Sequence, residues 1–376
     1  MPSLTAETYS RMPESPHSRF TRSRRRWLKQ AGVLASSTAL PFWIPGTSAQ
    51  TQTMLNTLPR VALVIGNTSY VDAPLKNPAN DARAIAGELQ RFGFQTVLKL
   101  DAGRTEMIEA IRAFADTLAQ KKGVGTFYYA GHGAQIAWKN YLIPVDAVID
   151  RLEDMQAKTV ELKALLDGLV RAQNPMNVII LDACRDNPFG NKVHAQQKGL
   201  SQFDAPPGSL LAYATSPGNV AADGEGANGL YTENLLRELK APETKIEDVF
   251  KRVRLAVRRS SQGQQLPWES TSLEEDFYFL PPKQVRKLSE DELEKQFEEE
   301  LAIWEKIKDL KEPAPIEDYL RRFPSGKFSE LAQFRLTRVL AQRAALVQAA
   351  LASKVLQTAT GANADFKYVP AAALKN

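Results

Sequence analysis

The segment "VIILDACRDNPFG", residues 178–190, contains Cys184, the only cysteine among the 376 residues of the chain. Four apolar residues precede Asp182, and a polar stretch follows Cys184. A short apolar run of this kind is typical of a buried strand in a parallel sheet. The segment therefore predicts a strand that ends at Cys184 and leaves the thiol at the strand's carboxyl end, where open α/β sheets carry their functional residues.

Similar apolar runs recur along the chain, and segments with apolar residues at helical spacing separate them. The predicted strands cover residues 60–67, 95–100, 125–133, 177–184 and 208–216, with a hairpin in 134–146 and a last strand within 266–279. The predicted helices cover residues 77–94, 105–120, 160–172, 230–239 and 246–260. Strands that alternate with helices predict an α/β fold, with a mainly parallel sheet covered by helices on both faces.

Composition and pattern divide the chain into five parts. These are an export signal (1–49), a polar linker (50–59), the α/β domain (60–282), a C-terminal α-helical segment (283–350) and a disordered tail (351–376). The helical segment consists of charged amphipathic helices interrupted at Pro324-Ser325-Gly326. This segment is a candidate surface for a protein partner.

The first 49 residues carry seven basic and two acidic side chains, which account for the whole formal net charge of +5. The rest of the chain is neutral, so its charge does not favour nucleic-acid binding. In the first part, "SRRRWLKQ" (residues 23–30) precedes an apolar run too short to span a bilayer and a small-residue cleavage site after Ala49. This pattern resembles a bacterial twin-arginine signal, which implies export of the folded protein to the periplasm and no membrane span after signal removal. An uncleaved membrane anchor and an ordinary Sec signal are the alternatives.

A catalytic thiol needs a base, and histidine is the side chain that titrates near neutral pH. Of the three histidines, His17 lies in the predicted export signal, and His194 lies in a polar loop without apolar anchors. His132 lies between two glycines at the end of a predicted strand, 52 residues before Cys184. We therefore expect a dyad of Cys184 and His132 on neighbouring strands. The alternative is that Cys184 is a small buried hydrophobic residue and His132 an ordinary hydrogen-bonded one.

The motifs "YYAGHG" (128–133) and "DACRD" (182–186), with a histidine about 50 residues before the cysteine, resemble those of the caspase-fold cysteine peptidases. The closest likeness is to their bacterial metacaspase-like members, the orthocaspases. "ALVIGNTSY…LKNPANDA" and "LLAYATSPGNVA" extend the resemblance over about residues 60–282. It implies a caspase-like, mainly parallel sheet sandwiched by helices. It also implies peptide-bond hydrolysis in which Cys184 is the nucleophile, His132 protonates the leaving amine, and the backbone N–H groups of Gly133 and Cys184 stabilise the oxyanion.

Two acids are candidates for substrate recognition. Asp182 lies two residues before Cys184, so both side chains point to the same face of the strand. In metacaspase-like enzymes the matching acid, together with the acid that matches Asp81, lines a pocket for Arg or Lys. The resemblance thus implies cleavage after Arg or Lys, and it makes Lys192 and Lys198 candidate sites of self-cleavage. Alternatively, Asp81 caps a helix and Asp182 only forms a strand-end hydrogen bond.

The sequence departs from the family pattern around this pocket. Ala130 stands where many metacaspases have serine, and Pro78 stands where they have a pocket cysteine. The calcium site of some relatives uses an acid that matches Asp146 together with an acidic pair. This chain has "TVELK" (159–163) in place of that pair, so we expect neither calcium activation nor any other cofactor.

Two rival functions belong to other classes. A catalytically silent caspase-like scaffold would bind protein partners through the C-terminal helices, but both candidate catalytic residues are present. A nucleotide-binding domain would need a glycine-rich phosphate loop after the first strand, and residues 66–77 contain neither GxGxxG nor GxxxxGK[ST]. The few histidines and the single cysteine are too scattered to predict a metal site.

Overall fold

The computed structural model describes residues 54–184, 200, 203–216, 226–283 and 288–363, all within the unit Ala49–Asn376. The predicted export signal, His194, the candidate cleavage sites Lys192 and Lys198, and the chain after residue 363 lie outside the described residues.

A mainly parallel sheet forms the centre of the α/β domain, as the sequence predicts. Its strands follow the order β2-β1-β3-β6-β7-β8, and only the pairing of β7 with β8 is antiparallel along this path. The bounds are β1 Arg60–Gly66, β2 Gln95–Leu100, β3 Val124–Ile136, β6 Met176–Cys184, β7 Ser209–Tyr213 and β8 Trp268–Thr271. Two short strands, β4 Lys139–Leu142 and β5 Val160–Glu161, extend from the end of β3 by antiparallel pairing.

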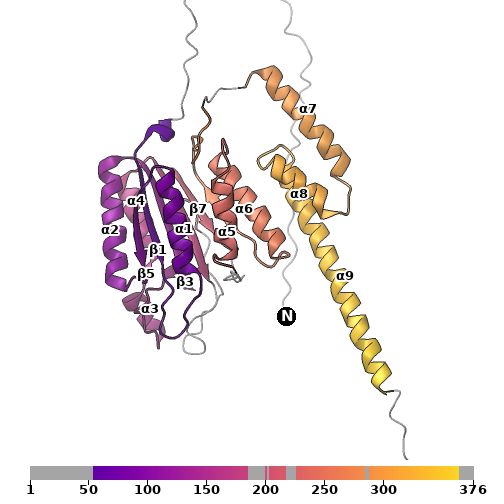
Figure 1. Ribbon diagram of the computed structural model, residues 1–376, viewed down its shortest axis with the longest axis horizontal. Coiled ribbons are helices and arrows are strands. Elements are labelled where there is room, and N and C mark those ends of the chain that lie inside the picture. Colours follow the sequence, from indigo (N-terminus) through magenta and orange to yellow (C-terminus); the bar gives the residue numbers. More distant parts are fainter. Residues whose placement is uncertain (1–53, 185–199, 201–202, 217–225, 284–287, 364–376) are drawn as a thin grey trace, which may run out of the picture. The chain divides into compact units, whose positions relative to one another are not determined.

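Helices cover both faces of this sheet (Figure 1). On one face lie α1 Pro78–Arg91, α5 Leu230–Leu239 and α6 Ile246–Ser260, and on the other lie α2 Arg104–Lys121 and α4 Leu162–Ala172. Successive strand residues alternate between the two cores: Val64 belongs to the α1 side, whereas Leu63 belongs to the α2 side. Because both faces are buried, the strands read as continuous apolar runs rather than as alternating ones.

The junction between β1 and α1 is tight. A Cβ added to Gly66, the last residue of β1, would lie 2.4 Å from the carbonyl oxygen of Pro78, so only glycine fits there. Asn77 is the N-cap residue of α1, and Pro78 occupies the first turn, where its missing N–H costs nothing. The interpretation of Asp81 as the cap of α1 is therefore wrong.

The predicted hairpin joins β3 to β4. Its two-residue turn consists of Ala137 and Trp138, which have φ angles of +48° and +65°. Positive φ at both central positions is the geometry of a type I′ turn, whose twist matches that of the paired strands. The short helix α3 Leu152–Lys158 follows this hairpin and was not predicted from the sequence.

The C-terminal segment contains α7 Glu290–Ile307, α8 Pro313–Arg322 and α9 Ser329–Asn363, with the predicted interruption between α8 and α9. These helices share a small apolar core that includes Trp304, Tyr319 and Leu336, and Leu255 of α6 packs against it. Helix α9 continues past residue 350, where we expected the helical segment to end. Among the described helices, none combines the length and apolarity needed to cross a membrane.

Candidate active site

The two sequence motifs meet at the carboxyl ends of β3 and β6. These strands are adjacent and parallel, and their register pairs His132 with Cys184. The expectation that the two residues lie on neighbouring strands is confirmed. The pairing brings the candidate base and the candidate nucleophile to the same position along the edge of the sheet.

His132 is buried and held in one orientation through its ring. Its Nε2 atom lies 2.7 Å from the carbonyl oxygen of Ala73, and its ring centroid lies 4.4 Å from that of Tyr70. A carbonyl oxygen can only accept a hydrogen bond, so Nε2 carries a proton in this contact. In the neutral imidazole, Nδ1 is then the nitrogen with the lone pair, and therefore the one that can take a proton.

Two tyrosines fix the backbone of His132. The Tyr70 hydroxyl accepts a hydrogen bond from the His132 N–H at 2.9 Å, and the Tyr129 hydroxyl donates one to the His132 carbonyl at 2.7 Å. Both tyrosines are less than 10% exposed. No motif in the sequence marks Tyr70, Ala73 or Tyr129 as partners of His132. Tyr70 and Ala73 lie about 60 residues before His132, and no local pattern connects the two segments.

The two glycines beside His132 are required for different structural reasons. Gly131 has a φ of +153°, and an added Cβ would lie 2.5 Å from the Tyr70 hydroxyl oxygen and 2.8 Å from that of Tyr129. Gly131 thus lets the strand pass beside the phenols that hold His132. An added Cβ on Gly133 would lie 3.1 Å from the Cβ of Ala183 in β6, which makes this position tight but less restricted. Gly133 directly follows His132 on β3, where its N–H group is a candidate oxyanion donor.

Asp81 lies in the first turn of α1 and is 3% exposed. Its Oδ1 atom accepts hydrogen bonds from the Asn228 amide at 2.8 Å and from the Gly229 N–H at 3.0 Å. Gly229 is the N-cap residue of α5. Asp81 therefore holds the start of α5, 148 residues away in the chain, rather than the start of its own helix.

Asp182 contacts the first turn of the same helix. The Thr232 hydroxyl donates to Asp182 Oδ2 at 2.6 Å, and the Tyr128 hydroxyl lies 2.6 Å from the same Thr232 oxygen. Thr232 has one hydroxyl proton and an ionised carboxylate can only accept, so Tyr128 must donate to Thr232. The result is a directed chain from Tyr128 through Thr232 to Asp182.

Tyr128 lies close to both acids. Burial raises the pKa of the Tyr128 phenol well above its ordinary value, and the negative charges of Asp182 and Asp81 raise it further. Burial and Asp182 act in the same direction on the pKa of Tyr231. Both phenols therefore stay protonated at neutral pH. The two predicted specificity acids thus lie near one buried phenol under the first turn of α5, and nothing in the sequence marks Tyr128 or Thr232 as a partner of these acids.

Asp146, the residue that matches a calcium ligand of some relatives, has a contact of its own. Its Oδ1 atom accepts a hydrogen bond from the Arg104 N–H at 2.9 Å, at the start of α2. A carboxylate at this position complements the partial positive charge of a helix N-terminus. Among the residues that the structure describes, no group of three or more His, Cys, Asp or Glu side chains is placed to hold a metal ion.

Comparison with known proteins agrees with this fold. Residues 59–278 match the peptidase C14 caspase domain. The mucosa-associated lymphoid tissue lymphoma translocation protein 1 of Homo sapiens and its homolog in Mus musculus are each 30% identical to this chain over 182 residues, or 47% of the chain. The aligned region spans only 21% of the length of either relative. Because the caspase-domain match covers more than half of the chain and includes β3 and β6 with the paired His132 and Cys184, the protein belongs to the caspase-domain family of cysteine peptidases.

Proposed function

We propose that this protein is a cysteine endopeptidase that cleaves peptide bonds after Arg or Lys. The observation that carries the proposal is the pairing of His132 with Cys184 across the ends of two adjacent strands. The hydrogen bond from His132 to the Ala73 carbonyl adds to it, because it leaves Nδ1 as the basic nitrogen. A nucleophile, a base and a group that orients the base are the parts that nucleophilic catalysis requires.

The reaction begins when Cys184 loses its proton to His132. The thiolate attacks the carbonyl carbon of the scissile bond, and the backbone N–H groups of Gly133 and Cys184 stabilise the resulting oxyanion. Removal of one such donor typically costs about 3 kcal/mol of transition-state stabilisation. The protonated His132 then gives its proton to the leaving amine, and an acyl-enzyme remains. Water, deprotonated by His132, attacks this thioester and regenerates the free thiol.

The two acids have different parts in substrate recognition. Asp182 is partly exposed, so we assign it the direct contact with the substrate cation. A guanidinium group can bind such a carboxylate through two parallel hydrogen bonds. Asp81 is buried, so it acts through its charge and through the start of α5. A substrate Asp would bring a third carboxylate to this site and would be repelled.

The proposal extends to location and activation. We infer export to the periplasm through the twin-arginine-like "SRRRWLKQ" segment, in an enzyme that needs no calcium. The contact of Asp146 with the start of α2 supports independence from calcium, because Asp146 then has a structural role that does not involve a metal ion.

The decisive experiment compares fluorogenic peptides that end in Arg, Lys or Asp with the exported form of the protein. We expect hydrolysis of the Arg and Lys peptides and little hydrolysis of the Asp peptide. Cys184→Ala and alkylation by iodoacetamide should each abolish the activity. A folded protein without activity on any of these peptides would instead favour the scaffold function, whereas full activity in Cys184→Ala would eliminate the mechanism.

A further inference from the structure

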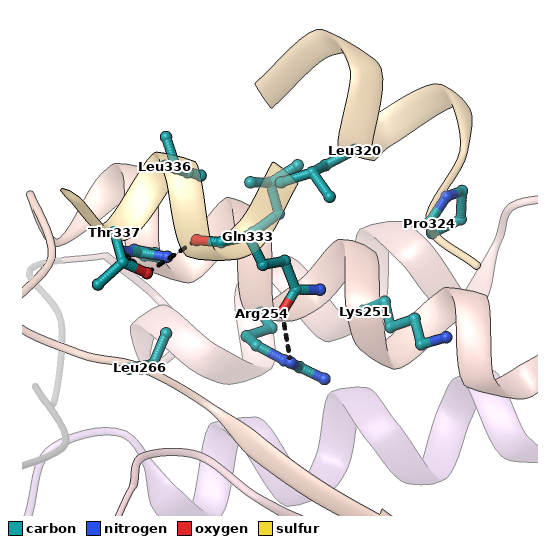
Figure 2. A pocket seen from close by; sticks show the side chains of 10 residues that line it. Lys251, Arg254, Leu266, Leu320, Pro324, Gln333, Leu336 and Thr337 are labelled. Atoms are coloured by element: carbon teal, nitrogen blue, oxygen red, sulfur yellow. Dashed lines mark hydrogen bonds between the residues drawn. The ribbon is translucent and has the colours of Figure 1, made fainter. Parts of the chain in front are cut away.

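A cavity of about 110 Å³ lies between α6 of the caspase domain and the C-terminal helices α8 and α9 (Figure 2). It shares no lining residue with the candidate active site. Its lining residues are Lys251, Arg254, Leu255, Arg258, Leu266, Leu320, Pro324, Gln333, Leu336 and Thr337.

One wall of this cavity is cationic. Lys251, Arg254 and Arg258 are spaced three and four residues apart on α6, so they share one face of the helix. The side chains that α9 contributes to the opposite wall, among them Gln333 and Thr337, are neutral. Figure 2 shows Gln333 reaching from α9 toward Arg254.

Each of the three cations contacts a neutral acceptor on the C-terminal segment. Arg254 Nη1 donates to Gln333 Oε1 at 3.2 Å, and Arg258 Nη2 donates to Thr337 Oγ1 at 3.1 Å. Lys251 Nζ donates to the Ser325 hydroxyl at 2.7 Å. These contacts supply hydrogen-bond geometry but no negative charge.

Few acids balance these charges. Among the described residues, Glu269 is the carboxylate that forms an ion pair with one of the three cations, and that cation is Arg254. Two further acids lie in the neighbourhood with partners of their own: Asp248 accepts from Ser325, and Glu317 pairs with Arg259. Counted together with Arg259, these side chains are four cations and three acids, so the cavity region keeps an excess of about one positive charge.

Burial makes this excess unfavourable. It lowers the pKa of Arg254 to about 10, with a further contribution from the charge of Arg258. Burial also lowers the pKa of Arg258, although Glu317 opposes the change. Two guanidinium groups thus repel each other at a site partly removed from water. An anion between them would relieve this repulsion.

We propose that this cavity binds a small free oxyanion of the phosphate type. A single tetrahedral ion fits the volume of about 110 Å³, which is well below the roughly 300–1,000 Å³ of sites for drug-sized ligands. An anion offsets this charge excess, and the wall offers the donors that an oxyanion needs from Lys251, Arg254 and Arg258. The Gln333 amide can donate from the other side. The anion therefore bridges α6 and α9 and stabilises the docking of the C-terminal segment on the caspase domain.

Titration calorimetry of the full chain with inorganic phosphate, in chloride buffer at constant ionic strength, tests the proposal. We expect saturable binding of one ion per chain and a phosphate-dependent rise in the melting temperature. Arg258→Gln should weaken binding at least about tenfold, since it removes a charged hydrogen-bond donor. The matched control is Arg259→Gln, which removes the same charge from an exposed neighbour on the same helix, outside the cavity.

Two results would overturn the proposal. One is the absence of saturable phosphate binding by the wild type. The other is an equal phosphate response in Arg258→Gln and Arg259→Gln, which would show that only the general charge of α6 matters. If Arg258→Gln does not fold, Thr337→Val serves in its place, because it removes the acceptor that orients the Arg258 guanidinium with no change of charge and little change of size. Unweakened binding in that variant would then contradict the proposed site.

Discussion

At the scale of single residues, His132 is predicted to act as both the base and the acid of the reaction. We predict that His132→Ala lowers kcat/KM on Arg peptides at least about 100-fold, the lower end of the contribution of a positioned acid–base group. The comparison is His194→Ala, since His194 is the other histidine outside the predicted export signal. Steady-state assays of both variants check this. A large loss of activity in His194→Ala, with near-normal activity in His132→Ala, would show that His132 is not the catalytic base.

Thr232 is predicted to determine specificity through Asp182. Thr232→Val keeps the shape of the side chain but removes the hydroxyl that donates to Asp182 Oδ2. We expect KM for Arg peptides to rise about tenfold while kcat changes little, because the change affects recognition of the cation rather than the dyad. Thr232→Ser retains the hydroxyl and should behave like the wild type. Equal kinetics in Thr232→Val and Thr232→Ser would show that the hydrogen bond does not position Asp182.

At the scale of elements, the end of β3 depends on Gly131. We predict that Gly131→Ala lowers the melting temperature and the activity together, because its Cβ would meet the Tyr70 and Tyr129 hydroxyls that hold His132. Gly87→Ala in α1 is the control, since an added Cβ there meets nothing within 4 Å and alanine favours a helix by about 1 kcal/mol. Thermal unfolding should therefore shift in opposite directions in the two variants. A Gly131→Ala protein as stable and active as the wild type would contradict this account of the strand end.

The elements show what a sequence can and cannot predict. The strands β1, β3 and β6 are apolar runs, so their existence and their place in a mainly parallel sheet follow from the sequence pattern, whereas their order in the sheet does not. The helix α3 has seven residues and the strand β5 has two, which is too short for a period to appear. The positions of α3 and β5 depend on the β3–β4 hairpin onto which they pack, and this packing is a tertiary contact that a local sequence pattern does not encode.

The candidate site likewise contains residues that the sequence predicts and residues that it does not. Cys184 and His132 stand out in the sequence because each is chemically unusual at the end of a strand. The groups that support them do not stand out. Tyr128, Thr232 and the Ala73 carbonyl acquire their roles through contacts between segments 50 to more than 100 residues apart, and Tyr128 alone looks like one more core aromatic.

At the scale of the whole molecule, the first 49 residues are predicted to direct the protein to the periplasm. We predict that replacing Arg24 and Arg25 by Lys leaves the precursor in the cytoplasm, because the twin-arginine route reads that pair. Cell fractionation followed by immunoblotting measures the outcome. The same substitutions at Arg19 and Arg22 conserve the charge in the same way and should leave export intact. Unchanged periplasmic recovery of the Arg24 and Arg25 variant would reject this route, though not export by another one.

The hydrogen bond that orients His132 ends on a main-chain atom. Every amino acid at position 73 presents a carbonyl oxygen, so side-chain replacement there leaves the orienting group in place. A saturation screen for inactive variants would therefore return Cys184 and His132 and pass over Ala73. Only a change in the course of the loop, such as the deletion of a residue between Tyr70 and Ala73, can withdraw that oxygen. The carbonyl group that orients His132 therefore depends on the length of the loop and not on the identity of residue 73.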